Sequence, residues 1–166
     1  ICEKMEAYLG EAMEKGLVLD AAIAQNETQA RAFWNLRENH TESQKREGPS
    51  IKHDISVSVS RIPAFMEEGL AAMKQALPDC RPVPFGHVGD GNLHFNCMAP
   101  AGWDKARFAP FIPKISGPIY DLVTKHGGSI SAEHGIGIEK IDELAHYRSK
   151  IELDTMRSIK IGRAHV

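Results

Sequence analysis

The sequence is poor in cysteine: it has three cysteines in 166 residues, and no two of them form a Cys-x-x-Cys pair. This spacing supports neither a disulfide framework nor a structural zinc knuckle, and it suits a reducing compartment. No apolar run reaches the roughly 18 residues that a membrane span needs, and no signal-peptide pattern is present. We therefore expect a cytoplasmic protein, or a mitochondrial matrix protein if the source is eukaryotic.

An excess of charge of either sign is also lacking. Lysine and arginine number 20 against 22 aspartate and glutamate, which gives a formal net charge of −2 and a pI near 6.5. This balance argues against nucleic acid or an anionic membrane as the main partner. Apolar residues make up 42% of the sequence, which is enough for one core. The length predicts one domain, or one domain with a fragment of another.

Local patterns in the first 60 residues predict helices and strands in alternation. Apolar residues recur at helical spacing over residues 1–15, with Gly16 as the terminating residue. The apolar run 17–24 predicts a short buried strand, and Asn26 is the expected N-cap of a helix that extends to about Glu47. Residues 51–59 then alternate as in a strand. One face holds Ile51, His53, Ile55, Val57 and Val59, and the other holds Lys52, Asp54, Ser56 and Ser58.

The remaining patterns complete an α+β fold. A helix is predicted from Pro63 to about Leu77, followed by a hairpin of strands 81–85 and 93–98. Residues 103–126 are helical but contain three prolines, so they should form two or three pieces that end at Gly127. A loop and a helix from about Lys140 follow. Together these elements predict an antiparallel sheet with helices packed on one face.

The residues that could bind a metal or transfer protons gather in two glycine-rich stretches, 86–96 (GHVGDGNLHFN) and 129–137 (SISAEHGIG). Asp90-Gly91 predicts a two-residue type I′ turn, which places His87 opposite His94 with Cβ atoms about 4.5–5.5 Å apart. Two imidazoles at this spacing can share a metal ion. Glu133 would be a third, anionic ligand, and His134 beside it would remain free for proton transfer.

These two stretches resemble the C-terminal half of FAD-linked oxidases of the vanillyl-alcohol-oxidase type, and the resemblance covers nearly all of residues 1–160. The family includes D-2-hydroxyglutarate dehydrogenases, FAD-dependent D-lactate dehydrogenases and the flavoprotein subunit of glycolate oxidase. It implies an FAD-binding domain ahead of this region. It also implies a divalent metal, usually zinc, held at the positions of His87, His94 and Glu133, with His134 as the catalytic base.

Three further positions resemble the D-2-hydroxyglutarate dehydrogenase branch of this family. The resemblance implies that Arg37, Thr41 and Lys52 hold the carboxylates of the substrate. Asn96 lies two residues after His94, on the same strand face, and could orient a carboxylate or a ligand histidine. The implied reaction is oxidation of a D-2-hydroxy acid to a 2-oxo acid with hydride transfer to FAD. Two cations favour the dicarboxylate D-2-hydroxyglutarate over D-lactate or glycolate, because an unpaired cation in a pocket is costly.

Simpler interpretations of the same residues remain open. Arg37 and Thr41 also fit the solvated face of an amphipathic helix, and Lys52 fits an edge strand protected by charge. His53 falls on the apolar face and is better explained as a hydrogen-bonded core histidine than as a ligand. A metal-binding module without redox activity, or a hydrolase built on two histidines and a glutamate, is the alternative function.

The resemblance also sets expectations for the ends of the chain and for its partners. Residues 1–160 would form the substrate and metal domain of a longer oxidase, with its own N-terminal FAD domain and an electron acceptor as partners. A homodimer is compatible with these features. Residues 161–166 match the translation of a common sequencing adapter, so we expect a non-native tail there.

Overall fold

The structure is a computed structural model that describes residues 2–163. It divides into two units, one that ends at Ser43 and one that begins at Gln44. The expected non-native tail lies partly outside the described residues, because residues 164–166 are not among them. None of the helices within residues 2–163 is both long and apolar enough to cross a membrane.

The first unit is helical. It contains α1 (Cys2–Glu14), α2 (Glu27–Glu38) and the start of α3 (His40–Glu47). The N-cap prediction for α2 is confirmed, because the side chain of Asn26 accepts a hydrogen bond of 3.0 Å from the backbone N–H of Gln29. The predicted single helix is interrupted at Asn39, which separates α2 from α3.

The buried strand predicted for residues 17–24 is wrong. This segment is a loop, in which the side chains of Leu17 and Leu19 are 77% and 94% exposed. A short apolar run reveals nothing about whether a neighbouring strand exists to pair with it. Gly16 does end α1 as predicted: it has a φ of 68°, and its backbone N–H donates to the carbonyl of Met13 at 2.9 Å.

The second unit is built around an antiparallel sheet. Strand β4 (Asn92–Met98) lies in the middle and pairs with β3 (Arg81–His87) on one side. On its other side lie β1 (Ser50–Ile51) and β2 (Asp54–Ser56). These two segments share one register against β4, and the N–H of Phe95 donates to the carbonyl of His53 between them at 2.7 Å. The strand predicted over 51–59 is therefore confirmed only as far as Ser56, and Val59 already begins the short helix η1 (Val59–Arg61).

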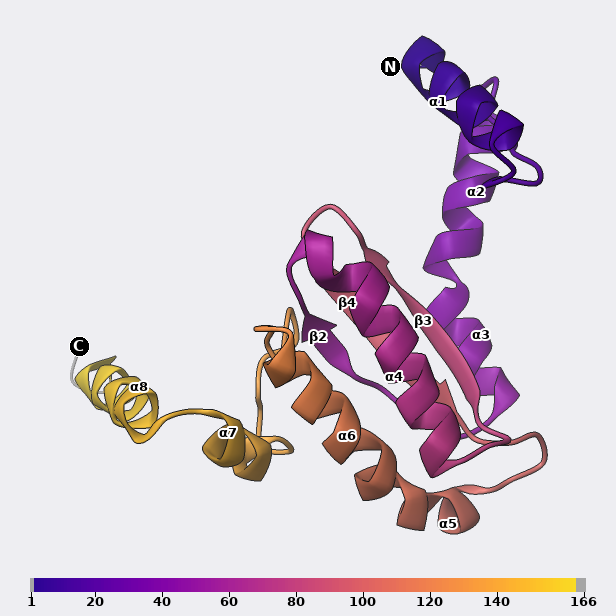
Figure 1. Cartoon of the computed structure of the whole chain (residues 1–166). Helices are drawn as coiled ribbons and strands as arrows, with labels where there is room; N and C mark the ends of the chain where they lie inside the picture. The colour runs from indigo at the N-terminus through magenta and orange to yellow at the C-terminus, as the bar shows by residue number, and fades with distance from the viewer. Residues whose placement is uncertain (1, 164–166) are drawn as a thin grey trace. The chain divides into compact units, whose positions relative to one another are not determined.

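Two helices cover one face of this sheet, as predicted for an α+β fold (Figure 1). They are α4 (Ile62–Ala76) and α6 (Ile112–Lys125). The prolines divide the helical stretch before His126 into α5 (Lys105–Phe108), η2 (Ala109–Phe111) and α6. Pro110 and Pro113 lie in the first turns of η2 and α6, and Pro118 lies in the interior of α6. The chain continues through α7 (Ile141–Tyr147) and α8 (Lys150–Arg163).

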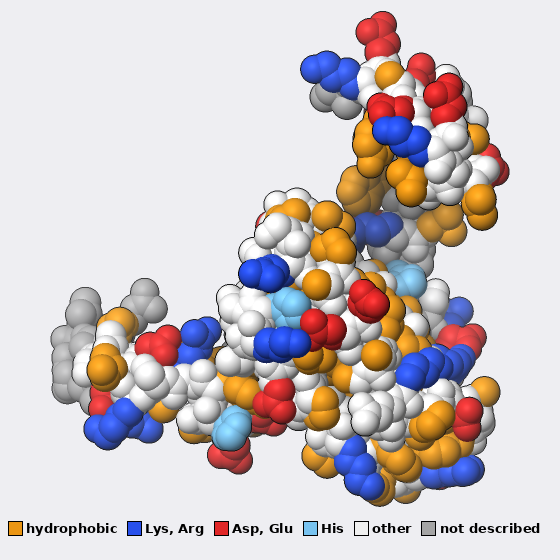
Figure 2. All heavy atoms as spheres, viewed as in Figure 1, with side chains coloured by type: hydrophobic (Ala, Val, Ile, Leu, Met, Phe, Trp, Pro, Cys, Tyr) orange, Lys and Arg blue, Asp and Glu red, His pale blue; other side chains and the backbone are white. Residues whose placement is uncertain are grey.

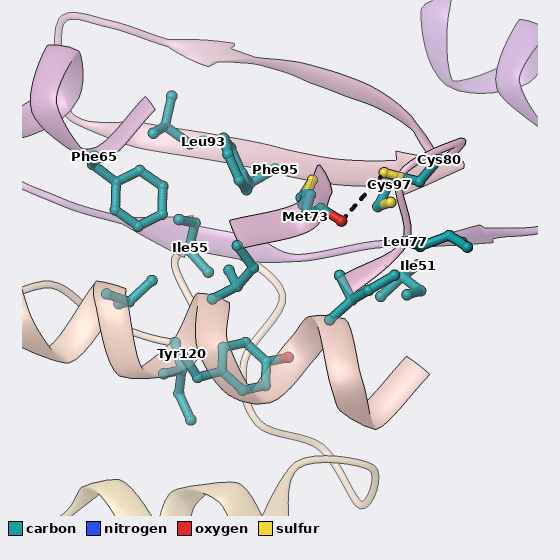
Figure 3. Packing of buried hydrophobic residues seen from close by; sticks show 14 of the residues in the cluster. Ile51, Ile55, Phe65, Met73, Leu77, Cys80, Leu93, Phe95, Cys97 and Tyr120 are labelled. Carbon is teal, nitrogen blue, oxygen red and sulfur yellow. Dashed lines mark hydrogen bonds between the residues drawn. The ribbon is translucent and has the colours of Figure 1, made fainter. Parts of the chain in front are cut away.

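The core fills the space between the sheet and the two helices (Figure 3). Phe65 from α4 and Phe95 from β4 are fully buried, with ring centroids 5.1 Å apart. Gly69 lets α4 approach the sheet closely, since a Cβ at this position would come within 2.7 Å of the Phe95 ring. The core therefore fixes α4 directly against the central strand.

The two faces of the central strand differ in chemistry. Leu93, Phe95 and Cys97 point into the core, whereas Asn92, His94 and Asn96 alternate onto the opposite face. We call this opposite face the polar face of the sheet. Over the side of the molecule seen in Figure 2, acidic and basic side chains are interspersed rather than gathered into a patch of one sign.

Candidate metal and substrate site

The hairpin that carries the two histidines has a longer loop than predicted. His87 pairs with Asn92, and Phe85 pairs with His94, so four residues rather than two connect the strands. The predicted type I′ turn is wrong because Gly91 has a positive φ of 76° but Asp90 does not. The side chain of Asp90 instead accepts a hydrogen bond of 3.1 Å from the N–H of Asn92.

A contact with Val57, the residue that follows β2, explains this departure from the predicted turn. The N–H of Val57 donates to the carbonyl of Gly91 at 3.0 Å. A Cβ on Gly91 would lie only 1.9 Å from the carbonyl oxygen of Val57. Gly91 therefore brings the hairpin loop onto the neighbouring strand segment, and a two-residue turn would withdraw it from this contact.

His87 and His94 nevertheless lie on the same polar face. The pairing is displaced by two residues, and a displacement by two preserves the side of the sheet to which each side chain points. The two imidazoles are diagonal neighbours, with ring centroids 6.4 Å apart and planes nearly perpendicular. Two nitrogen donors therefore face one region of the surface.

The carboxylate of Glu133 lies close to both imidazoles. Its Oε1 is 3.4 Å from Nδ1 of His87, and its Oε2 is 4.0 Å from Nε2 of His94. Imidazole nitrogen and carboxylate oxygen are donors that zinc takes at about 2.0–2.2 Å. The side chains of Glu133 and His87 are 45% and 39% exposed, which leaves access for a further ligand. His87, His94 and Glu133 thus offer donors of the types that catalytic zinc sites use.

The loop that carries Glu133 is held by Asp54. This aspartate is only 3% exposed, and its Oδ2 accepts hydrogen bonds from three consecutive backbone N–H groups. The donors are Ala132 at 3.2 Å, Glu133 at 2.9 Å and His134 at 2.8 Å. Burial by itself would raise the pKa of Asp54, but these hydrogen bonds and the nearby histidines lower it below its ordinary value.

His134 lies beside this carboxylate with most of its ring in solvent. Its Nδ1 is 3.8 Å from Oδ2 of Asp54, its side chain is 65% exposed, and its ring stacks on His94 at 5.7 Å. Among the described residues, Asp54, His94 and His134 offer ligand atoms that all lie within 4.8 Å of one another, a mutual approach that the predicted set His87, His94 and Glu133 does not reach. Burial lowers the pKa of His94, and the charges of Asp54 and Glu133 only partly oppose this. His94 is therefore held neutral, as a metal ligand must be.

The structure places the four predicted substrate residues in two groups. Lys52 is exposed on the polar face, where the register of the flanking pairs sets it opposite Asn96. Asn96 is buried, and its Nδ2 donates to Oε1 of Gln44 at 2.9 Å. Arg37 and Thr41 belong to the first unit, where both are exposed, on α2 and α3 respectively.

Two residues of the site were missed by the sequence analysis. Asp54 was assigned only to a strand face, although aspartate is depleted in strands and so could have signalled a special role. Lys140 donates to the carbonyl of Ile130 at 3.0 Å and holds the other end of the same loop. No local pattern around Lys140 indicates this long-range contact.

Comparison with known proteins adds the family. The sequence model of the family described as FAD linked oxidases, C-terminal domain, matches residues 1–161. The chain belongs to this family. A D-2-hydroxyglutarate dehydrogenase of Stutzerimonas stutzeri is 40% identical over 158 residues, which cover 95% of this chain and 34% of the relative. The mitochondrial D-2-hydroxyglutarate dehydrogenase of Arabidopsis thaliana is 40% identical over 159 residues, which cover 95% of this chain and 27% of the relative.

A mitochondrial Schizosaccharomyces pombe protein with D-lactate dehydrogenase in its name is 33% identical over 168 residues, which cover 95% of this chain and 31% of the relative. The chain thus spans about a third of the length of the curated relatives that it matches. These relatives carry the names of two substrates, a dicarboxylate and a monocarboxylate.

Proposed function

We propose that residues 1–160 form the substrate- and metal-binding domain of a longer FAD-dependent dehydrogenase that oxidises D-2-hydroxyglutarate to its 2-oxo acid. The observation that carries this proposal is the approach of the Glu133 carboxylate to His87 and His94 on one sheet face, beside the accessible His134. The family and the names of the relatives support the reaction class. The FAD domain and the electron acceptor would be the partners of this domain.

The proposed metal ligands are His87, His94 and Glu133, which would hold a divalent ion such as zinc. When bound, such an ion supplies Lewis acidity that makes a substrate hydroxyl more acidic. Of the two histidines, His94 is kept ready for this role because its neutral ring retains a lone pair on one nitrogen. The polar face presents both rings from paired strands, with ring centroids 6.4 Å apart.

The proposed base is His134. With a proton on Nδ1, directed at Oδ2 of Asp54 at 3.8 Å, the ring keeps a lone pair on Nε2. This Nε2 can take the hydroxyl proton from the substrate, and the Asp54 carboxylate stabilises the imidazolium that forms. Hydride acceptance is the chemistry that FAD supplies when bound.

Lys52 is the proposed anchor of the distal carboxylate. Its ammonium group is exposed on the polar face and makes no hydrogen bond or ion pair with the residues that the structure describes. The shared carboxylate next to the hydroxyl would fall to Asn96, which lies on the same polar face. The substrate roles of Arg37 and Thr41, which belong to the first unit, stay predictions from the sequence. D-lactate lacks the second carboxylate and would leave Lys52 without a partner.

The proposal is tested with a panel of D-2-hydroxy acids on the full-length protein, with a dye as electron acceptor. We expect D-2-hydroxyglutarate to give the highest kcat/KM. A preference for D-lactate would favour the second candidate, to which the Schizosaccharomyces pombe relative points. Failure of every 2-hydroxy acid to reduce the dye would contradict the proposed reaction.

The role of Lys52 gives a sharper test. We expect Lys52→Ala to lower kcat/KM for D-2-hydroxyglutarate by on the order of 2 kcal/mol or more, because a charge-assisted pair is lost. The loss for D-lactate should be small. Lys105→Ala, which removes an exposed lysine of α5, is the matched control and should change neither value. Equal losses of kcat/KM for the two substrates would show that Lys52 does not bind the distal carboxylate.

A further inference from the structure

One buried oxygen of the site lacks a hydrogen-bond partner among the residues that the structure describes. Asp54 uses Oδ2 for the three N–H groups of the loop, but its Oδ1 is buried and accepts no hydrogen bond from residues 2–163. An unsatisfied acceptor in the interior is costly, and more so when it is charged. Nδ1 of His94 lies 3.7 Å from this oxygen. Such contacts are often long before a site is loaded and shorten on binding.

The two nitrogens of His94 face two different carboxylates. Nδ1 lies 3.7 Å from Oδ1 of Asp54, and Nε2 lies 4.0 Å from Oε2 of Glu133. A neutral imidazole carries one N–H and one lone pair. Because an ionised carboxylate can only accept, the proton belongs on the nitrogen that faces the buried Asp54. The lone pair is then on Nε2, on the side of Glu133 and His87.

We propose that Asp54 is a positioning residue that sets both the tautomer of His94 and the position of the loop that carries Glu133 and His134. One oxygen holds the proton on Nδ1 of His94, so that Nε2 is free to bind a metal. The other oxygen fixes the three backbone N–H groups. This inference rests on the proposed function only in taking Nε2 of His94 as a metal ligand. The inference goes beyond the proposed function because it makes one carboxylate responsible for positioning two of the three proposed metal ligands.

The substitution Asp54→Asn separates these two tasks. An amide has one acceptor oxygen and one NH₂ group, and three N–H donors of the loop require the oxygen. The NH₂ group must then face Nδ1 of His94. Since it donates, Nδ1 must accept, and the proton moves to Nε2, where it blocks the metal. The variant thus keeps the loop in place but sets the wrong tautomer.

The first measurement is the tautomer of His94, read from its ¹⁵N chemical shifts in the metal-free full-length protein at pH 8. We expect a protonated Nδ1 in the wild type and a protonated Nε2 in Asp54→Asn. On addition of zinc to the wild type, the shift of Nε2 should change. A protonated Nε2 in the wild type would overturn the inference, and so would a zinc-induced shift at Nδ1, which would place the ion on the Asp54 side.

The second measurement is zinc affinity, by competition with a chromophoric chelator. Loss of a carboxylate that orients a ligand histidine typically weakens metal binding about 10- to 100-fold, and we expect this for Asp54→Asn. Asp121→Asn removes another carboxylate that accepts a side-chain hydrogen bond, from Tyr147 at 2.8 Å and outside the site, and it should bind zinc like the wild type.

These outcomes separate the inference from the proposed function. Wild-type zinc affinity in Asp54→Asn would overturn the inference while leaving the metal site intact. A wild type that binds no zinc would refute the metal site, and the tautomer of its His94 would still decide the role of Asp54. If Asp54→Asn does not fold, the tautomer of His94 in the wild type and its response to zinc still decide the role of Asp54.

Discussion

His53 should make the stability of this fold depend on pH. Its ring is 1% exposed, and both nitrogens are used: Nδ1 lies 2.9 Å from the carbonyl of Phe95, and Nε2 lies 2.9 Å from Oγ of Ser116. Burial lowers its pKa from 6.5 to about 4; the bond to Phe95 opposes this, and the charge of Lys140 adds to it. The ring is therefore neutral in the folded protein, as expected for a core histidine.

The direction and size of the effect follow from proton linkage. Below pH 6.5 the unfolded chain binds a proton on His53 that the folded chain does not bind until pH falls to about 4. The contribution is therefore absent above pH 6.5, and the free energy of unfolding decreases as pH falls from 6.5 towards 4. Each factor of ten in proton affinity corresponds to about 1.4 kcal/mol, so the loss amounts to about 3 kcal/mol at pH 4.

The assay is urea unfolding of the chain at several pH values between 7.5 and 4. His53→Phe removes the titrating group, so its free energy of unfolding should fall by about 3 kcal/mol less than that of the wild type over this range. The variant should start from a lower stability, since Ser116 and Phe95 each lose a partner, but only the difference in slope is diagnostic. His146→Phe, at an exposed histidine, should retain the wild-type slope. Parallel curves for wild type and His53→Phe would refute the reasoning.

Two further predictions concern the packing of the sheet. In thermal melts, Gly91→Ala should lower the free energy of unfolding by about 2 kcal/mol or more, because the new Cβ would collide with the carbonyl of Val57 and the backbone has a positive φ. Gly89→Ala, whose Cβ would meet only open space, should be close to neutral in the same assay. Phe95→Ala should cost about 3–5 kcal/mol in urea unfolding, whereas Phe33→Ala, at a ring that is 45% exposed, should cost far less. Similar losses within either pair would contradict the packing described here.

Period-two alternation was sufficient to predict the polar face but not the register. The predicted pairing of His87 with His94 was wrong by two residues, and an error of two leaves every side chain on its own face. The true register depends on Gly91, whose carbonyl binds the N–H of Val57, more than thirty residues earlier in the chain. A turn signal is local and contains no information about such a contact.

Contacts distant in sequence account for the other differences as well. Residues 17–24 have the composition of a strand, but none of the strands in residues 2–163 lies beside them to accept their hydrogen bonds. Asp54 has the opposite character: its residue type disfavours a strand, yet its partners are N–H groups 78 to 80 residues later. His53 was predicted correctly because both its burial and its face follow from alternation alone.

The alternation around His53 also joins the core to the candidate site. Ile51, His53 and Ile55 point into the core, so the residues between them, Lys52 and Asp54, are fixed on the polar face. A side chain on a strand is placed as precisely as the strand itself, which is why sites on rigid elements are accurate. Protonation of His53 would disfavour the burial of this segment and thereby release the lysine and the aspartate together. We therefore expect acid to weaken the geometry of the site through the core, in parallel with the loss of stability, in addition to its direct effect on His94.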